Sequence, residues 1–309
     1  MGDRSPRRGS LAYWHRSRAK RLVPRVRSWP KGGSGLGAFA GYKAGMASVM
    51  MVDDTDAATK GQEIVVPVTV VEVPPLYICA IVAYKKTTFG IKAAGQLNAT
   101  GLPKQLKRVT TPPKRAGDAG KLAGADEYRV LASTQPWKSG LGKKTPEVLE
   151  IGLAGTPEAQ LEYAKSVLGK EVKATDAIKP GEFIDAISVS IGRGWQGIIK
   201  RRGVSLNPRK ASQARRHGGS IGGERQAKVM YTIPRAGQHG FHRRTDSNKR
   251  VLAVGDATTS PSKDYPHYGP VKAELLLLKG SVPGPAKRFI TLRRALLAPM
   301  AVKAPNLLK

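Results

Sequence analysis

Nearly all of the net positive charge of this 309-residue chain lies in three segments that are poor in hydrophobic periodicity. Residues 1–31 carry ten Lys and Arg against one acid, residues 85–115 carry eight against none, and residues 193–250 carry fifteen against two. These segments therefore account for +30 of the formal net charge of +31. Because they are also rich in Gly and Pro, they cannot bury enough apolar surface to offset the entropy of ordering. We expect a nearly neutral globular body with three basic arms or loops that a polyanion orders.

The charge distribution favours nucleic acid as the partner, since a phosphate backbone rewards many Lys and Arg through counterion release. A membrane partner would require a basic amphipathic helix or an apolar anchor. Neither is present in the sequence, because no apolar run approaches the ~18–20 residues of a membrane span. The basic N-terminus also lacks the apolar region of a secretory signal. The one cysteine, Cys79, lies in an apolar run, where it is expected to be a core residue of a protein kept in a reducing cytoplasm.

β-Branched residues are concentrated in two neighbouring runs, 64–73 and 76–83, which predict strands. Pro67 indicates an edge or a bulge in the first of them. Because Pro74-Pro75 separates the two runs, they are expected to pair as an antiparallel meander. Residues 85–125, in contrast, lose periodicity and are expected to form a long basic loop. Further strands are expected at 47–52, 172–174, 183–191, 229–234, 251–254, 273–278 and 288–292.

One helix is predicted to begin after Thr156, which has the features of an N-cap residue. Pro157 suits the first helical position, and Glu158 places a negative charge in the first turn. Leu161 and Ala164 share one face of this helix, and Gly169 ends it. Many short strands with few helices are typical of a mainly β fold with a barrel or sandwich core.

Two glycine-rich motifs resemble nucleotide-binding sequences but lack their context. Residues 192–197 (GRGWQG) have the spacing of a dinucleotide fingerprint, yet no helix is expected behind them and the first acid downstream is Glu224. Residues 142–145 (GKKT) lack the hydroxyl residue that directly follows the lysine of a P-loop. The glycines instead allow the backbone to approach a phosphate or a base closely.

Histidines gather near a second glycine-rich stretch, residues 235–244 (RAGQHGFHRR). His239 and His242, with His217 nearby, lack the further thiolates or imidazoles that zinc requires. RNA contact is therefore expected here, with a solvated loop as the alternative. Two glycines flank Gln238 and His239, so that backbone could approach a base while the side chains contact its edge or stack. No arrangement of acids, nucleophile or base indicates a catalytic site.

Aromatic rings are interleaved with arginine in the first 38 residues, where Tyr13, Trp14 and Trp29 occur. Such rings stack either on bases or on the protein body. An arm ordered by RNA is expected, with a permanently disordered tail as the alternative.

Several ordered motifs resemble the ribosomal protein L3 family of the large subunit, in its archaeal form. Residues 39–46 (FAGYKAGM) are similar to the first-strand motif of that family, and residues 67–75 (PVTVVEVPP) follow in the expected place. Residues 235–249 resemble its central loop, and residues 279–288 (KGSVPGPAKR) its C-terminal signature. Residues 9–11 and 28–30 resemble the archaeal N-terminal arm. The resemblance spans nearly the whole chain and is weakest at 85–150.

The resemblance implies a β-barrel of the translation-protein type on the subunit surface, with a small helical and loop insertion and long basic extensions. Two extensions would run through large-subunit rRNA towards the peptidyl transferase centre, and the family also acts early in subunit assembly. The central extension of the family carries a tryptophan at its tip, which this chain replaces with residues 220–226 (SIGGERQ). Gln238 matches a glutamine that is methylated in bacterial members.

The expected organisation follows from these motifs. Residues 1–38 form a basic arm, and residues 193–250 form a central basic extension that penetrates rRNA. The barrel is contributed by residues 39–84, 171–192 and 251–309, the last with a C-terminal tail, whereas residues 85–170 form the insertion.

The residues expected to bind rRNA are basic residues of the arms, with a few aromatic and polar partners. Lys and Arg would contact phosphate, preferably as arginine forks. The basic set is Arg4, Arg7, Arg8, Arg16, Arg18, Lys20, Arg21, Arg25, Arg27, Lys43, Arg193, Lys200, Arg201, Arg202, Arg209, Lys210, Arg215, Arg216, Arg225, Arg235, Arg243, Arg244, Lys249, Lys287 and Arg288; the others are Trp14, Trp29, Trp195, Gln238, His239 and His242.

A structural, non-enzymatic rRNA-binding protein of the cytoplasmic ribosome is thus expected. Its partners would be large-subunit rRNA and neighbouring large-subunit proteins, with no membrane and no small-molecule substrate. No cofactor is expected, apart from magnesium associated with the rRNA. The alternative is an RNA-modifying enzyme with basic clamps, which would need a cofactor pocket or an acid/base pair that the sequence does not offer.

Overall fold

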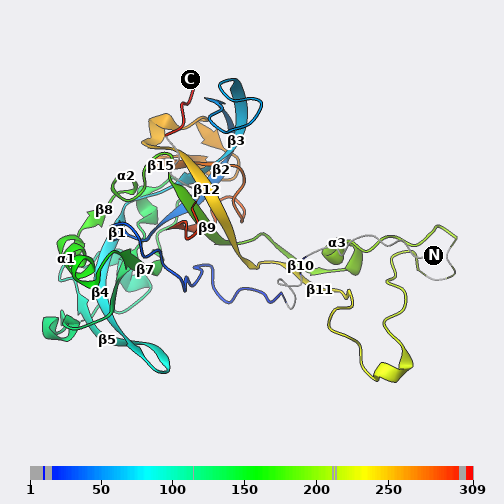
Figure 1. Cartoon of the computed structure of the whole chain (residues 1–309), viewed down its shortest axis with the longest axis horizontal. Helices are drawn as coiled ribbons and strands as arrows, with labels where there is room; N and C mark the ends of the chain where they lie inside the picture. The colour runs from blue at the N-terminus through cyan, green and yellow to red at the C-terminus, as the bar shows by residue number, and fades with distance from the viewer. Residues whose placement is uncertain are drawn as a thin grey trace. The chain divides into compact units, whose positions relative to one another are not determined.

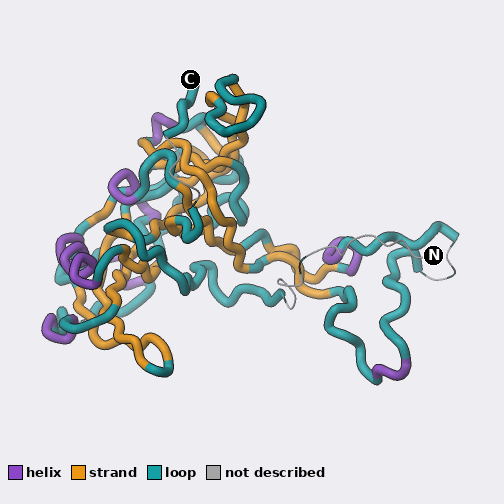
Figure 2. Tube along the Cα trace, in the orientation of Figure 1, coloured by secondary structure: helices purple, strands orange, loops and turns teal. Residues whose placement is uncertain are grey.

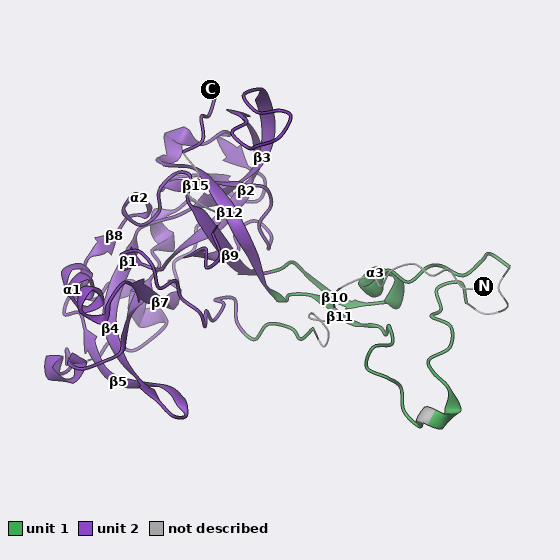
Figure 3. Ribbon diagram, in the orientation of Figure 1, with its two compact units in different colours: residues 1–20, 190–243 green, residues 21–189, 244–309 purple. Residues whose placement is uncertain are grey.

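The structure is a computed structural model, and it is mainly β, as the sequence predicts (Figure 2). It divides into two compact units (Figure 3). Unit 1 comprises Met1–Lys20 and Ser190–Arg243, and unit 2 comprises Arg21–Val189 and Arg244–Lys309. The structure describes residues 10, 16–113, 115–210, 212, 214–298 and 304–308.

Six antiparallel strands of the larger part of the chain form a closed barrel, in the order β12-β15-β3-β2-β16-β9. Strands β2 and β3 form a long hairpin in which Tyr42 pairs with Glu72 and Val52 with Glu63. Strand β16 joins the start of β2 to β9, with Ile290 opposite both Gly41 and Ser188. The barrel strands are β2 Ala38–Val52, β3 Glu63–Glu72, β9 Phe183–Val189, β12 Arg243–Gly255, β15 Leu275–Lys279 and β16 Phe289–Arg294.

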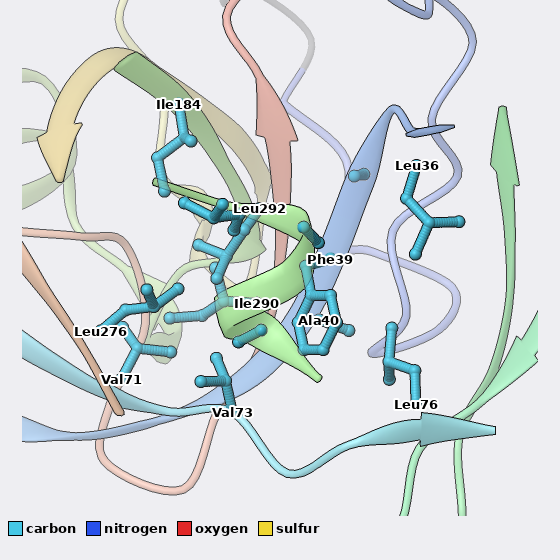
Figure 4. Packing of buried hydrophobic residues seen from close by; sticks show 14 of the residues in the cluster. Leu36, Phe39, Ala40, Val71, Val73, Leu76, Ile184, Leu276, Ile290 and Leu292 are labelled. Atoms are coloured by element: carbon cyan, nitrogen blue, oxygen red, sulfur yellow. The ribbon is translucent and has the colours of Figure 1, made fainter. Parts of the chain in front are cut away.

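The barrel holds a dense apolar core, because its strands are rich in Val, Ile and Leu with buried side chains. Phe39, Ile290 and Leu292 are fully buried (Figure 4). The rings of Tyr42 and Phe289 meet edge to face, with centroids 6.1 Å apart. Such apolar contacts, rather than charge, stabilise unit 2.

A second sheet lies beside the barrel in unit 2 (Figure 1). Its strands follow the order β1-β7-β6-β4-β5, and β8 also pairs with β4. Helix α1 (Pro157–Val167) packs on this sheet, where the amide of Gln160 accepts from Tyr128 N and donates to Leu153 O. The strands of the second sheet are β1 Gly35–Leu36, β4 Leu76–Thr87, β5 Gly90–Asn98, β6 Glu127–Ser133, β7 Val148–Ala154 and β8 Glu171–Val172.

Short elements complete the two units. Those of unit 2 are η2 Lys104–Arg108, η3 Ala119–Leu122, η4 Pro136–Lys138, α2 Ala174–Ala177, η6 Ala257–Thr259, β13 Asp264–Tyr265 and β14 Gly269–Pro270. Those of unit 1 are β10 Gly192–Gln196, α3 Ile198–Arg202, η5 Glu224–Gln226 and β11 Gly237–Gly240.

Several elements are confirmed as predicted. Thr156 caps α1 by accepting from Ala159 N, and Gly169 has a positive φ of +73° just after the helix. Cys79 is buried in β4, where burial raises the pKa of its thiol to about 11. Pro67 lies just beyond the last residue pair between β15 and β3, Lys279 with Val68, so this part of β3 is an edge as expected.

The predicted meander of residues 64–83 is wrong, because β3 and β4 do not pair with each other. β3 belongs to the barrel and β4 to the second sheet, and Pro74-Pro75 carries the chain between them. The buried carboxylate of Glu72, at the end of β3, accepts hydrogen bonds from the backbone N–H groups of Gly140, Lys272 and Ala273 and from the Tyr268 hydroxyl. These bonds fix the crossing from one sheet to the other.

The expected basic loop at 85–125 is wrong for residues 85–98, and the predicted strand at 229–234 is also wrong. Residues 85–98 extend β4 and form β5, which pair as a hairpin despite their charge. The insertion also contains β6, in which the buried residues Tyr128 and Val130 alternate with more exposed ones. Residues 229–231 remain exposed without a strand, because none of the described strands of unit 1 offers them a buried face.

Candidate nucleic-acid interface

The framework of unit 1 is a two-stranded antiparallel ribbon formed by β10 and β11. Trp195 pairs with Gln238, and Gly192 pairs with Gly240. Gly240 has a φ of +73°, and a Cβ there would lie only 2.0 Å from Ile191 O, so the ribbon requires glycine at this position. The segment 237–240, expected to be a loop, is therefore a strand whose backbone is held by its neighbour.

A short helix, α3, follows β10, although none was expected behind GRGWQG. Gly197 precedes it, and Gly203 ends it in the left-handed conformation with φ +69°. The helix is five residues long, and Lys200, Arg201 and Arg202 occupy its last turn, where cations suit the helix dipole. Because β10 pairs with β11 in antiparallel fashion, the segment lacks the parallel strand–helix–strand unit of a dinucleotide site.

Arg201 braces α3 against β11 instead of pointing freely outward. Its guanidinium donates to Gln238 O at 3.0 Å and to Arg235 O at 2.8 Å. Gly237 leaves room for this contact, because a Cβ there would lie 3.2 Å from the guanidinium carbon. Burial, and then the positive charge of Arg16, lowers the pKa of Arg201. We therefore assign Arg201 a structural role within unit 1.

Gln238 and His239 are half-buried on β11. The Gln238 amide donates to Gly240 O at 3.1 Å. His239 Nδ1 is buried and accepts or donates no hydrogen bond within the part of the chain that the structure describes. Burial, followed by the charges of Arg193, His242, Arg16 and Arg201, lowers the pKa of His239. The imidazole is therefore neutral at neutral pH and offers a ring and a buried nitrogen rather than a positive charge.

His242 joins the end of the N-terminal arm to the central extension. Its ring Nδ1 lies 2.9 Å from Ser17 O, and its backbone N donates to Ser190 Oγ at 3.1 Å. Ala19 N donates to Phe241 O at 2.8 Å beside it. Since His242 is only 4% exposed, it stabilises unit 1 and is not accessible to a large ligand. Sequence reasoning could not find this contact, which joins residues more than 200 positions apart.

The charged groups of unit 1 are almost all basic. Its described part contains fifteen Lys and Arg and one carboxylate, that of Glu224. Trp195 is 76% exposed beside this charge. No described residue of unit 1 belongs to a hydrophobic core. The exposed site residues predicted here are Arg18, Lys20, Arg193, Trp195, Lys200, Arg209, Lys210, Arg215, Arg216, Arg225, Arg235 and Arg243, whereas Arg16 and Arg202 are half-buried.

Two of the site residues predicted in unit 2 contribute to its interior. Lys43 is buried, and its ammonium donates to Val282 O at 2.7 Å and to Gly284 O at 3.1 Å, while burial lowers its pKa. The ring of Trp29 packs directly over Gly152, where a Cβ would lie 2.4 Å from the indole. Lys43 therefore holds a loop, and Trp29 stacks on the protein body, which was one of the two expected outcomes for this ring.

The remaining predicted residues of unit 2 are more accessible. Lys249 pairs with Asp246 at 2.9 Å, and burial lowers the pKa of the half-buried Arg288. Arg21, Arg25, Arg27 and Lys287 are exposed, and Arg244 is half-buried. Arg4, Arg7, Arg8 and Trp14, with Tyr13, lie outside the described residues.

The described residues show no cluster of three or more His, Cys, Asp and Glu that could hold a metal ion. Within the same residues, none of the helices has the length and apolarity needed to cross a membrane.

Comparison with known proteins identifies the family. The family model for ribosomal protein L3 matches residues 1–112 and 119–308. The large ribosomal subunit protein uL3 of Methanothermobacter thermautotrophicus is 44% identical over 310 residues, which cover 95% of this chain and 92% of that protein. The proteins of the same name from Archaeoglobus fulgidus and Pyrobaculum calidifontis are 42% and 44% identical and cover 96% and 97% of this chain, and 93% and 94% of their own length. The chain therefore belongs to the ribosomal protein L3 family.

Proposed function

We propose that this protein is a structural constituent of the large ribosomal subunit that binds large-subunit rRNA through unit 1. Membership of the ribosomal protein L3 family supports the subunit assignment. The single observation that carries the RNA assignment is the contrast within unit 1 between fifteen described basic residues and one carboxylate, without a hydrophobic core. Such a surface is costly to assemble alone and is stabilised by neutralisation on a phosphate backbone.

The contacts divide into two kinds. Exposed Lys and Arg, such as Arg209 and Arg215, bind phosphate and supply most of the affinity without reading sequence. The ribbon provides the second kind, because the exposed ring of Trp195 can stack on a base and Gln238 presents an amide beside it. Arg201 and His242 hold this ribbon in shape from within.

The extensions would run through rRNA towards the peptidyl transferase centre, and binding would occur early in subunit assembly. The partners would be large-subunit rRNA and neighbouring large-subunit proteins on the ribosome. The protein would need no cofactor of its own, since magnesium would accompany the RNA. We infer a non-enzymatic role, which membership of the ribosomal protein L3 family supports.

The salt dependence of binding tests this proposal. Affinity of the full-length protein for large-subunit rRNA should fall steeply with salt, by roughly 0.7–0.9 in the slope of log affinity against log salt for each phosphate neutralised. Six or more contacts would give a slope of about −4 or steeper. A slope near −1, or equal affinity for an uncharged polymer, would contradict a phosphate-dominated interface. Turnover of naked rRNA by the purified protein would favour an RNA-modifying enzyme instead.

A further inference from the structure

The hairpin of β4 and β5 extends beyond the second sheet as a bare two-stranded ribbon (Figure 1). All residues from 85 to 94 are exposed, whereas residues 78–83 of β4 are buried. A two-stranded hairpin without a packed face is marginally stable in water. This ribbon therefore needs either internal support at its base or a partner along its surface.

Hydrogen bonds and side-chain contacts hold the base of the ribbon, where it leaves the second sheet. The Asp126 carboxylate accepts from Lys86 N at 2.7 Å, and Asp126 N donates to Tyr84 O at 2.9 Å. The Arg129 guanidinium lies 4.5 Å from the centre of the Tyr84 ring. On the other strand, Gly95 allows close approach of η3, because a Cβ there would lie 2.8 Å from Lys121 O. The distal half of the hairpin is thus presented from a braced stem.

The tip of the hairpin presents an aromatic ring to solvent. Phe89 is 102% exposed, the highest exposure among the large hydrophobic residues that the structure describes. The Thr87 hydroxyl donates to Gly90 O at 2.7 Å across the turn, and Gly90 has a φ of +119°, which L-residues rarely adopt. The turn therefore holds Phe89 outward, where burial against a partner would remove a large apolar surface from water.

Lysines occupy both strands behind this ring. Lys85 and Lys92 are direct cross-strand partners, so their ammonium groups share one face and repel each other. Lys86 adds a third positive charge, and the sequence contains no Asp or Glu between Glu72 and Asp118. An anion bound on this face would be attracted by both lysines and would offset the repulsion between them.

We propose that the β4–β5 hairpin is a further RNA-binding element, in which Phe89 stacks on an unpaired base and Lys85 and Lys92 contact the flanking phosphates. This inference rests on the proposed function and adds a site in unit 2 that lies outside the basic surface of unit 1. Base stacking on an aromatic ring beside cationic groups is the usual chemistry of single-stranded or looped RNA. An acidic or apolar protein surface would satisfy either the lysines or the ring, but RNA satisfies both.

The β2–β3 hairpin shows the opposite chemistry and provides matched controls. Its connection, residues 53–62, contains Asp53, Asp54 and Asp56 against one lysine, Lys60. Val65, the most exposed large apolar residue of this hairpin, is 65% accessible. A phosphate backbone would be repelled there, so substitutions in this hairpin should not affect RNA binding.

The ring is tested with Phe89→Ala, Phe89→Trp and the control Val65→Ala in full-length protein bound to large-subunit rRNA. Phe89→Ala should weaken binding roughly 5- to 150-fold, the equivalent of ~1–3 kcal/mol of stacking, with an unchanged salt slope. Phe89→Trp should retain the affinity, and Val65→Ala should bind as the wild type does. Because Phe89 is fully exposed, neither of its two variants should change the thermal unfolding of the protein.

The charges are tested with Lys85→Gln/Lys92→Gln against the control Lys60→Gln. The double variant should reduce the steepness of the salt slope by roughly 0.7–0.9 for each phosphate that it no longer neutralises, and the control should not change it. In addition, a photoreactive benzoylphenylalanine at position 89 of the assembled subunit should crosslink to rRNA.

Three outcomes would overturn the inference. If wild-type protein binds rRNA with a steep salt slope but Phe89→Ala and the lysine variants bind equally well, the hairpin is not an RNA site while the proposed function stands. A crosslink from position 89 only to another protein would assign the hairpin to a protein partner. If the wild type fails to bind rRNA, the proposed function and this inference both fail.

Discussion

Unit 1 and the barrel of unit 2 differ in how much apolar surface they bury and in the balance of their charges. Unit 2 contains fully buried side chains such as Phe39, Ile290 and Leu292, and its interior includes the buried Asp185–Arg293 ion pair at 2.6 Å. Unit 1 has no described residue in a hydrophobic core and carries one described carboxylate for fifteen basic groups. Unit 2 is stabilised by burial, whereas the proposed function requires an external polyanion to stabilise unit 1.

The comparison shows how a segment can be locally ordered without a hydrophobic core. In unit 1 the ribbon of β10 and β11 relies on backbone pairing, on glycines that permit close approach and on the Arg201 brace. These contacts shape a surface but bury little apolar area, so their net contribution to stability is modest. Stability and RNA binding should therefore respond to different substitutions in the two units.

The largest effect on stability should come from the barrel core. Phe39→Ala should lower the free energy of unfolding by ~3–5 kcal/mol, since it removes a fully buried ring and leaves a cavity. Ile221→Ala, at a 43%-exposed position of unit 1, should change it by less than ~0.5 kcal/mol. Denaturant unfolding followed by circular dichroism would measure both. A comparable decrease from Ile221→Ala would show that unit 1 has a core of its own.

The next prediction compares the effect of removing positive charge from unit 1 with the effect of removing it from unit 2. Replacing Arg209, Lys210, Arg215 and Arg216 with Gln should make the salt slope of rRNA binding shallower by roughly 0.7–0.9 for each phosphate left unneutralised, without changing the thermal midpoint of unfolding. The matched control is the exposed unit 2 set Lys144, Lys165, Lys170 and Lys173. Equal effects of the two sets would mean that net charge, rather than the surface of unit 1, determines binding.

The sequence predicted the elements that local physics determines. The β-branched run of β3 and the capping residues of α1 specify a strand and a helix wherever they lie in the fold. The pairing of β3 was predicted incorrectly, because a Pro-Pro turn does not reveal whether the next strand stays in the same sheet. Long-range contacts of Glu72 decide that, and they connect residues about 70 and 200 positions apart.

Some features that were not predicted had a readable signal. The alternation of Tyr128, Val130 and Ala132 in β6 has period two and could have predicted the strand. Phe89 was not among the predicted site residues, because lysines on both faces of the ribbon obscure the alternation of apolar and polar residues that marks a strand. The readable signal was an aromatic residue within a segment that contains no acid. No sequence signal indicated that Lys43, Arg201 and His242 contact backbone carbonyls inside the protein. The sequence around a basic residue does not show whether its side chain binds phosphate or a backbone carbonyl.

The smallest expected effect concerns pH and the acidic connection between β2 and β3. The hydroxyls of Thr59 and Thr55 and the Thr55 backbone N–H donate to the Asp53 carboxylate and lower its pKa to about 2. Because the folded-state pKa lies below the ordinary value of ~4, this carboxylate stabilises the fold above pH ~4. That contribution is lost as the pH falls from ~4 to about 2.

Thermal unfolding between pH 2 and 5 would measure it. Asp53→Asn should reduce the loss of stability on acidification, and the exposed control Asp264→Asn should behave as the wild type does. Identical pH profiles of Asp53→Asn and wild type would show that these hydrogen bonds do not stabilise the ionised carboxylate.

Hydrogen exchange of the full-length protein, free and bound to large-subunit rRNA, tests the central claim most directly. In the free protein, amides of β3 and β16 should be strongly protected, whereas residues 204–234, which form few backbone hydrogen bonds among the described residues, should exchange rapidly. Binding of rRNA should slow exchange in residues 204–234 by orders of magnitude and leave the barrel unchanged. Equal protection of both regions before RNA is added, or no change in unit 1 afterwards, would contradict the account.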